Sequence, residues 1–305
     1  MTSTVNKIEG IVSATPTPID AEGGIDRTAV SDMIENLIAA NTAGIAPIGG
    51  TGEATALSRR QKRGMLDATL EAVAGRVPVI PGLLSPGLGD TLEEAAEYAA
   101  AGADMLMLVT PYYARPTEQG FVDYFKRVSD SVDLPLMLYE IPYRTGIQLS
   151  LETVVRLADE TRVTAMKACS LDTRYQMQTV ELVGDRVSIL TGQEDVFPLH
   201  MAMGARGGML AGSCIIPNLW NKVYKLCADG KNAEALALHQ EIMPFISMLY
   251  REHNPGPIKA ALELMGLSHG GCLPPLRSAS PEVVEALKLA LPAILEKEKS
   301  AANQN

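Results

Sequence analysis

Cysteine is scarce in this chain and shows no ligand pattern. The four cysteines are widely spaced, without a Cys-x-x-Cys pair, and the four histidines lack the spacing of metal ligands. Neither a structural zinc site nor metal-dependent chemistry is therefore expected, and we predict no cofactor. The cysteines are expected to be small apolar thiols of the core.

Long hydrophobic runs and basic clusters are also missing. No stretch approaches the ~18 uninterrupted apolar residues of a membrane span, and residues 1–10 lack the apolar core of a signal peptide. The net charge is −10, from 26 basic and 36 acidic residues, and no basic run interrupts it. This charge argues against nucleic-acid or anionic-membrane partners. We expect a cytoplasmic protein that acts on a small molecule.

What the sequence does have is the profile of a globular protein with a sizeable core. Of its 305 residues, 47% are hydrophobic and 20% are charged. Short apolar runs recur along the chain and predict eight strands, at Gly10–Pro18, Gly44–Gly50, Val77–Leu83, Met105–Pro111, Leu134–Pro142, Val163–Ser170, Val187–Gln193 and Gly208–Cys214.

Segments of helical period separate these runs. Asp26–Asn41 carries one apolar stripe, and Ser58–Ala74 begins with a capping serine. The other helices are expected at Thr91–Ala101, Thr117–Ser131, Ser150–Glu160, Asp172–Val183, Glu194–Met203 and Pro217–Ala228. Eight strands each followed by a helix predict an α/β protein with a TIM (β/α)8 barrel. An open doubly wound sheet fits less well, because no long polar edge strand is present.

The pattern changes after residue 230. From there we find no strand signal, only helical stretches at Asn232–Arg251, Pro257–Gly266 and Pro281–Lys299, the last with a bend expected at Pro292. We therefore divide the chain into a catalytic barrel, residues 1–230, and a C-terminal three-helix extension, residues 231–305.

One residue stands out among the strands. Lys167 lies in the apolar run Val163–Ser170 without a charged partner in the segment. An ammonium group is costly to desolvate, so such a lysine either reaches the strand end or a buried carboxylate, or has a lowered pKa and acts as a nucleophile.

The C-terminal strand ends of a barrel carry its chemistry. Here they present an amine, phenols and hydroxyls without metal ligands, at Thr15, Gly49–Glu53, Thr110–Tyr113, Tyr139, Lys167, Gln193 and Ser213. Such a set suits chemistry on a carbonyl compound, in which the amine attacks and the hydroxyl groups move protons.

Four motifs resemble those of one family. They are Gly49-Gly-Thr-Gly-Glu53, Thr110-Pro-Tyr-Tyr-Ala-Arg-Pro116, Tyr139-Glu-Ile-Pro-Tyr-Arg-Thr-Gly146 with Lys167, and Asn254-Pro-Gly-Pro-Ile-Lys259. Together they resemble the dihydrodipicolinate synthase / N-acetylneuraminate lyase family of Schiff-base aldolases. The arginine after the strand-five tyrosine places the chain nearest to the synthases.

The resemblance implies a role for each motif residue. Lys167 would form an imine with pyruvate or another 2-oxo acid, and Tyr139 would relay protons with help from Thr51. Tyr113 would reach into the site of a neighbouring subunit, so the protein would be a homo-oligomer, a dimer or a tetramer. Its partners would otherwise be the 2-oxo acid and an aldehyde.

The same resemblance implies three substrate contacts. Arg144 would bind a carboxylate of the aldehyde through paired hydrogen bonds. Gly50 and Thr51, in the Gly49–Glu53 turn, would offer N–H groups to the carboxylate of the 2-oxo acid, and Met209 would lie beside its pyruvyl group. From the residues alone, Arg144 could instead pair with Glu140 or Glu152, and Tyr113 could pack at the barrel rim. Glu53 is expected to hold the loop.

Two departures from the family pattern affect the substrate. Gly50 replaces the first of two hydroxyl residues in the usual motif, so a proton relay through that hydroxyl is lost. This favours another aldehyde or a dehydratase reaction on a sugar acid. The loop at residues 81–89 is longer and more apolar than its counterpart, which argues against feedback inhibition by lysine.

The sequence thus predicts a lyase most like dihydrodipicolinate synthase, which condenses pyruvate with aspartate semialdehyde. A 2-keto-3-deoxy sugar acid aldolase or dehydratase, or a related deaminating lyase, is the alternative. A non-catalytic sensor of 2-oxo acids is a more distant one.

Overall fold

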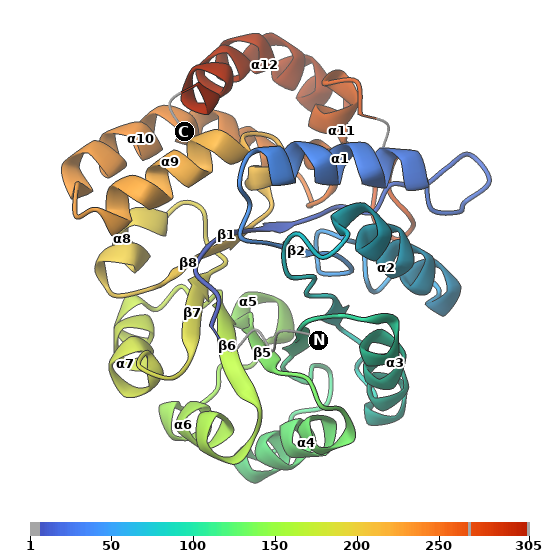
Figure 1. The fold of residues 1–305 in the computed structure, drawn as a ribbon, viewed down its shortest axis with the longest axis vertical. Coiled ribbons are helices and arrows are strands. Elements are labelled where there is room, and N and C mark those ends of the chain that lie inside the picture. Colours follow the sequence, from blue (N-terminus) through green and yellow to red (C-terminus); the bar gives the residue numbers. More distant parts are fainter. Residues whose placement is uncertain (1–6, 268–269, 304–305) are drawn as a thin grey trace.

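The structure is a computed structural model that describes residues 7–267 and 270–303. Eight parallel strands form one sheet in the order β2-β1-β8-β7-β6-β5-β4-β3. A parallel bridge between Ile45 and Val79 joins the two ends, so the sheet curls into a barrel with helices around it (Figure 1). The predicted (β/α)8 barrel is confirmed.

Seven of the strands lie within the predicted apolar runs, β8 begins one residue before its run, and all eight are shorter than predicted. Their bounds are β1 Gly10–Ala14, β2 Gly44–Ala46, β3 Gly82–Leu83, β4 Leu106–Val109, β5 Leu136–Glu140, β6 Val163–Ala168, β7 Ser188–Thr191 and β8 Gly207–Leu210. Nearly every strand residue is buried, because side chains fill the barrel on one face and helices cover the other. The remaining residues of each run form the loops at the strand ends.

Five of the eight barrel helices begin after a residue whose side chain caps them. Ser58 accepts a hydrogen bond from the Gln61 N–H in a full capping box, whereas Thr117 and Ser150 each accept a single hydrogen bond from the third N–H group of their helix. The barrel helices are α1 Arg27–Ala39, α2 Arg59–Val73, α3 Leu88–Ala101, α4 Glu118–Ser131, α6 Leu151–Glu160, α7 Thr173–Val183, α8 Phe197–Ala202 and α9 Pro217–Ala228.

Two short elements lie outside the expected pattern. Helix α5 is a single turn at Pro142–Thr145, between β5 and α6, and a 3-10 turn covers Gly212–Cys214 after β8. The predicted helix Glu194–Met203 was too long at its start, because α8 begins only at Phe197. Glu194 instead belongs to the loop after β7.

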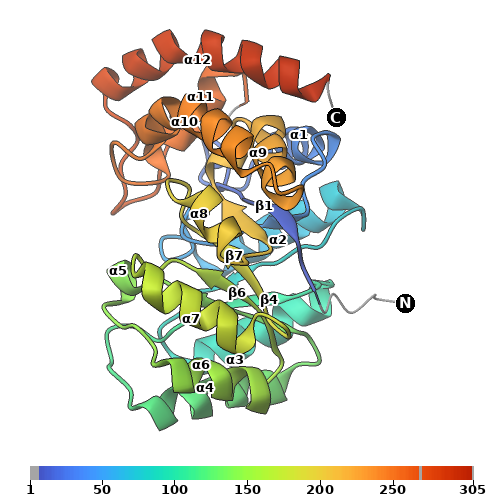
Figure 2. The same ribbon diagram turned by 90° about the vertical axis from the view of Figure 1, so that its left-hand side faces the viewer.

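The chain ends in α10 Asn232–Leu249, α11 Gly256–Leu264 and α12 Pro281–Ala302. Helix α10 packs against α8 and α9, α12 packs against α9, and α11 packs against α10 and α12, on one side of the barrel (Figures 1 and 2). Glu298 of α12 accepts hydrogen bonds from the Asn218 and Leu219 N–H groups, at 2.8 and 2.9 Å, and so caps α9. Pro292 lies inside α12, which continues through it.

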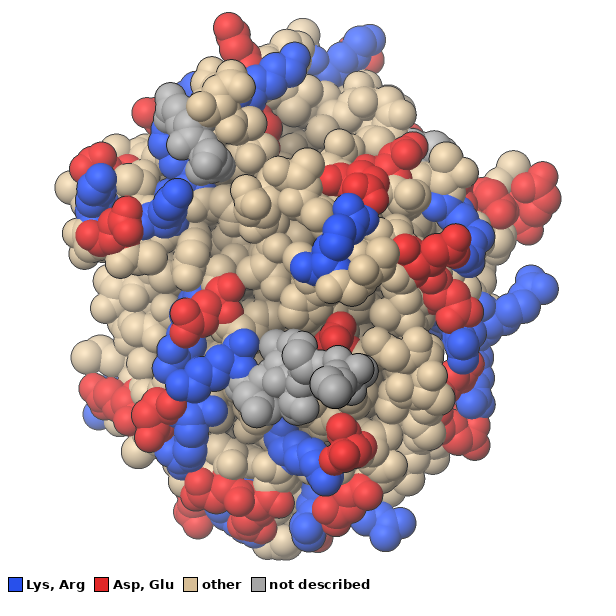
Figure 3. All heavy atoms as spheres, viewed as in Figure 1, with Lys and Arg blue, Asp and Glu red and all other residues tan. Residues whose placement is uncertain are grey.

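None of the helices in the described residues is long and apolar enough to cross a membrane. On the face seen in Figure 3, acidic and basic side chains are interspersed around the rim. The lysine and arginine side chains on that face do not gather into one patch.

Candidate active site

A cavity of about 470 Å³ opens at the C-terminal ends of the strands. Residues of the strand-end loops line it, together with residues from α10 and the segment that follows it. Six of the seven predicted site residues lie on its wall, namely Gly50, Thr51, Tyr139, Arg144, Lys167 and Met209. The fold therefore brings together groups that are up to 159 positions apart in the sequence.

Lys167 is the buried amine of this cavity. It is the fifth residue of β6 and only 7% exposed, and no carboxylate of the described residues forms an ion pair with it. Burial lowers its pKa, and the nearby Arg144 guanidinium lowers it further. Gly192 leaves room for this side chain, because a Cβ there would lie 3.0 Å from Lys167 Cε.

Tyr139 lies directly beside this amine. The two residues are register partners across β5 and β6, and Lys167 Nζ lies 4.6 Å from the centre of the tyrosine ring. Tyr139 is 4% exposed, and burial raises its pKa well above the usual range. Its hydroxyl therefore keeps its proton near neutral pH and can donate it to a developing negative charge.

The Gly49–Glu53 turn forms the wall above β2. Its residue Glu53 has a positive φ of 57° and is buried, with an ion pair of 2.5 Å to Lys259. Glu53 also accepts a hydrogen bond from the Leu273 N–H at 2.7 Å. Glu53 thus holds the turn against the C-terminal extension, as expected, and leaves Gly50 and Thr51 to face the cavity.

Arg144 lies at the rim of the cavity, on α5. It forms no ion pair with Glu140 or Glu152 in the described part of the chain, although the sequence left those pairs open. Its Nη1 atom lies 3.6 Å from where a Cβ of residue 50 would be. The guanidinium is therefore available to an anionic group that enters the cavity.

Tyr113 is the predicted site residue that does not reach this cavity. Its side chain is 99% exposed, and its backbone has a positive φ of 73°. The preceding Tyr112 donates a hydrogen bond to the Leu84 carbonyl at 2.9 Å, which anchors the segment. Within a single chain, Tyr113 therefore points away from Lys167.

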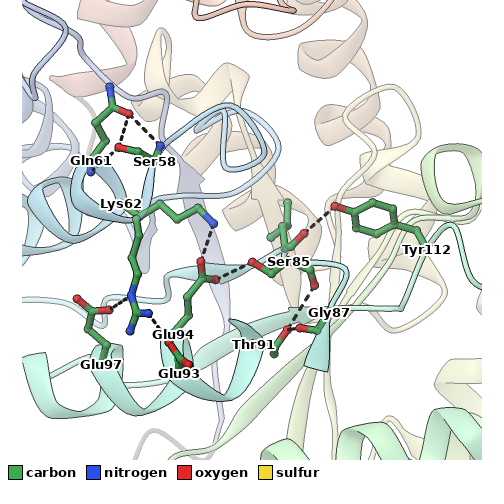
Figure 4. A network of polar contacts seen from close by, with 12 residues as sticks. Ser58, Gln61, Lys62, Ser85, Gly87, Thr91, Glu93, Glu94, Glu97 and Tyr112 are labelled. Atoms are coloured by element: carbon green, nitrogen blue, oxygen red, sulfur yellow. Dashed lines mark hydrogen bonds and ion pairs between the residues drawn. The ribbon is translucent and has the colours of Figure 1, made fainter. Parts of the chain in front are cut away.

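The loop after β3 accepts the hydrogen bond from Tyr112, and a polar network holds this loop in place (Figure 4). Ser85 donates to Glu94 at 3.2 Å, and Glu94 pairs with the buried Lys62 at 2.7 Å. Thr91 donates to the Gly87 carbonyl at 2.9 Å. These contacts hold the longer apolar loop in place, and the absence of lysine inhibition stays a prediction.

Sequence reasoning gave no site role to several residues of the cavity wall, among them Glu194, Tyr250 and Asn254. Glu194 was expected in a helix, but its carboxylate turns inward and accepts hydrogen bonds from the Ala211 and Gly212 N–H groups and from Tyr250, at 2.9, 2.8 and 2.7 Å. Burial raises its pKa. Nothing in the sequence pointed to Tyr250, whereas Asn254 lies in the motif Asn254–Lys259.

The chemistry of the site follows from these groups. A buried amine with a lowered pKa, a protonated phenol and a guanidinium without an ion-pair partner in the described residues surround one cavity. They suit nucleophilic attack on a carbonyl compound that carries an anionic group. No cluster of three or more His, Cys, Asp or Glu residues that could hold a metal ion occurs in the described residues.

The fold and the cavity define a (β/α)8 barrel with a buried lysine in the wall of a cavity at the C-terminal ends of its strands. Residues 7–294 match the dihydrodipicolinate synthetase family. The 4-hydroxy-tetrahydrodipicolinate synthase of Exiguobacterium sibiricum is 35% identical over 268 residues, which cover 88% of this chain and 92% of that protein. The chain belongs to the dihydrodipicolinate synthetase family, and the predicted resemblance is confirmed.

Solved structures agree with this assignment. The 4-hydroxy-tetrahydrodipicolinate synthase of Methylacidiphilum fumariolicum SolV has a TM-score of 0.91 and is 30% identical, with 98% of this chain and 99% of that chain covered. A structure described as a monomeric dihydrodipicolinate synthase variant also has a TM-score of 0.91, with 27% identity and coverage of 98% and 99%.

Proposed function

We propose that this protein is a Schiff-base-forming lyase that condenses pyruvate with aspartate semialdehyde, the reaction of 4-hydroxy-tetrahydrodipicolinate synthases. The observation that carries this proposal is the pairing of the buried Lys167 with Tyr139 in a cavity that also contains Arg144. The relatives' names support the same reaction.

The reaction begins at Lys167. Its free amine attacks the 2-oxo carbon of pyruvate, and the resulting carbinolamine loses water to give a protonated imine. The imine withdraws electrons, so the pyruvyl methyl group loses a proton and becomes an enamine. The enamine carbon then attacks the aldehyde and forms the new carbon–carbon bond. The aldehyde oxygen takes up a proton in this step.

Tyr139 and the turn after β2 serve this sequence in different ways. The Tyr139 hydroxyl supplies and removes protons at the carbinolamine and at the aldehyde oxygen. Gly50 and Thr51 bind the carboxylate of pyruvate, and Met209 packs beside its pyruvyl group. Arg144 binds the carboxylate of aspartate semialdehyde, so the aldehyde carbon is directed towards the enamine.

Two measurements test the proposal. Borohydride reduction in the presence of pyruvate should leave a stable adduct on Lys167, which mass spectrometry of the digested protein would locate. The purified protein should also condense pyruvate with aspartate semialdehyde faster than the uncatalysed reaction. Absence of the adduct would refute the Schiff-base reaction, and would be the result expected of a sensor that only binds 2-oxo acids.

A second reaction is favoured by one observation at Gly50. A Cβ there would lie 3.7 Å from Tyr139 Oη, so the glycine leaves a space that a hydroxyl-bearing side chain could fill. A substrate hydroxyl in that space would suit a 2-keto-3-deoxy sugar acid aldolase or dehydratase, or a related deaminating lyase. Cleavage of such an acid, without condensation of aspartate semialdehyde, would establish this alternative.

The assembly is part of the same proposal. Tyr113 is exposed in the single chain and held in a strained backbone conformation, which suits a side chain that enters a neighbouring subunit. We therefore expect a dimer or a tetramer in light-scattering measurements. We also propose a cytoplasmic location, and a division of the chain into a barrel at residues 1–230 and an extension at residues 231–305.

A further inference from the structure

The C-terminal extension contributes a side chain to the turn that faces Lys167. Asn254 lies on the cavity wall, and its Nδ2 donates a hydrogen bond to Thr51 Oγ1 at 2.9 Å. The two residues are 203 positions apart, in the segment between α10 and α11 and in the turn after β2. Asn254 therefore lines the cavity itself and also binds a second residue that lines it, Thr51.

This contact determines what the Thr51 hydroxyl can do. A hydroxyl group has one hydrogen and can accept further hydrogen bonds through its oxygen. Because Asn254 donates to that oxygen, the hydrogen of Thr51 is left for another acceptor. The described part of the chain offers it no further partner, and Thr51 is 6% exposed and lines the cavity. The hydrogen is therefore left for a group that enters the cavity.

We propose that Asn254 is a positioning residue that fixes the Thr51 hydroxyl as a hydrogen-bond donor to the carboxylate of the bound 2-oxo acid. This inference rests on the proposed function, because it takes the ligand to be a 2-oxo acid. Asn254 acts through Thr51, and its amide donates where a carboxylate at the same place could not. The direction of this hydrogen bond is therefore the testable feature.

The surroundings keep Asn254 in place. Five residues further on, Lys259 forms the buried ion pair with Glu53, and Lys259 also donates to the Gly271 carbonyl. The turn after β2 is therefore bound to the extension at two residues, at Thr51 by Asn254 and at Glu53 by Lys259. Asn254 Oδ1 is buried and has no hydrogen-bond partner in the described residues. This costs stability, as residues that serve a ligand often do.

A purely structural role of Asn254 and a positioning role predict different effects when Asn254 is replaced. If Asn254 only held the loop, its loss would lower the thermal stability and affect every step of the reaction. If it orients Thr51, its loss weakens pyruvate binding specifically, and the effect disappears when Thr51 has no hydroxyl. A double-mutant cycle separates these two cases.

The experiment uses the intact protein and pyruvate. For wild type, Asn254→Ala, Thr51→Val and the double variant, the pyruvate concentration that gives half-maximal borohydride adduct on Lys167 is measured, together with the melting temperature. We expect Asn254→Ala to raise that concentration about tenfold relative to wild type, as for one lost hydrogen bond to a charged group. When Thr51 is already valine, the same substitution should raise it less than about twofold. The isosteric Asn254→Asp should raise it more than Asn254→Ala. Its carboxylate would accept the Thr51 hydrogen and repel pyruvate.

The control is Asn232→Asp, which adds the same charge to an exposed asparagine of the extension. It should leave pyruvate binding unchanged. Equal effects of Asn254→Ala in wild type and in Thr51→Val would overturn the inference, as would a fall in melting temperature without weaker binding. A wild-type protein that forms no adduct at all would refute the proposed function instead, so the two failures are distinguishable.

Discussion

Lys167 Nζ lies 4.6 Å from the centre of the Tyr139 ring, and the two residues pair in register across β5 and β6. Both side chains are buried, and burial disfavours the charged form of each. The pKa of Lys167 is lowered and that of Tyr139 is raised, so one residue moves towards the free amine and the other keeps its proton. Imine formation needs both a free amine at Lys167 and a protonated hydroxyl at Tyr139.

This pairing predicts the pH dependence of imine formation. The rate of adduct formation with pyruvate should rise with pH as Lys167 loses its proton, with a midpoint below the 10.5 of an ordinary lysine. Cyanoborohydride trapping over a pH series measures that midpoint. Lys167→Arg should form no adduct at any pH, because its guanidinium stays protonated. A midpoint at or above the ordinary value would contradict the effect of burial.

Restoring a hydroxyl at residue 50 should test the proton relay. A Cβ at Gly50 would lie 3.7 Å from Tyr139 Oη and 3.6 Å from Arg144 Nη1, which are ordinary contact distances. Gly50→Thr should therefore fold and raise the condensation rate about tenfold or more if the relay limits it. Gly50→Ala adds the methyl group without the hydroxyl and should not. An equal effect of both would show that the hydroxyl is irrelevant.

Arg144 should affect the second substrate and spare the first. Arg144→Lys removes the paired hydrogen bonds, so the KM for aspartate semialdehyde should rise about 10- to 100-fold. Borohydride trapping of pyruvate on Lys167 should change little. Steady-state kinetics and trapping on the same preparation measure both. If the two fall together, Arg144 binds pyruvate or supports the fold, and it does not select the aldehyde.

Glu140 should make stability depend on pH. It is fully buried, and burial raises the pKa of its carboxyl from 4.5 to about 8, which a hydrogen bond from the Leu149 backbone only partly offsets. Between these values the folded state binds a proton that the unfolded state has lost. The free energy of unfolding should therefore fall as the pH rises from about 5 to about 8.

Glu140→Gln tests that effect because it keeps the shape and cannot ionise. Between about pH 5 and pH 8, the melting temperature of this variant should decrease less than that of wild type, as measured by calorimetry. Glu285→Gln, at an exposed glutamate, should behave as wild type. If Glu140→Gln showed the wild-type pH dependence, the ionisation of other groups would account for it.

Tyr113 should act in a neighbouring subunit. Tyr113→Phe and Lys167→Ala should each be inactive alone, but their mixture should regain activity, because the Lys167→Ala subunit supplies Tyr113 to the intact lysine of its partner. Random mixing makes half of the dimers hybrids with one complete site each, so recovery of up to about one quarter is expected. Assays of co-expressed variants measure it. No recovery in confirmed hybrids would place Tyr113 outside the reaction.

Much of the fold could be predicted because its signals are local. The eight apolar runs, the helical periods and the capping Ser58 depend on neighbouring residues only, and they located the strands and most helices. Lys167 and Tyr139 could be placed at strand ends for the same reason. The start of α8 was wrong because Glu194 reads as a helix residue, while its carboxylate satisfies N–H groups of another loop.

The sequence by itself determined the barrel, the family and the positions of the amine and the phenol. Only the tertiary structure decided what surrounds them. Packing of the C-terminal extension against the turn after β2 brings Asn254 within 2.9 Å of Thr51 and Lys259 within 2.5 Å of Glu53. In the barrel, Lys167 is buried without an ion-pair partner among the described residues. Hydrogen bonds and burial depend on distances in space, and no local pattern encodes distances between residues so far apart in the chain.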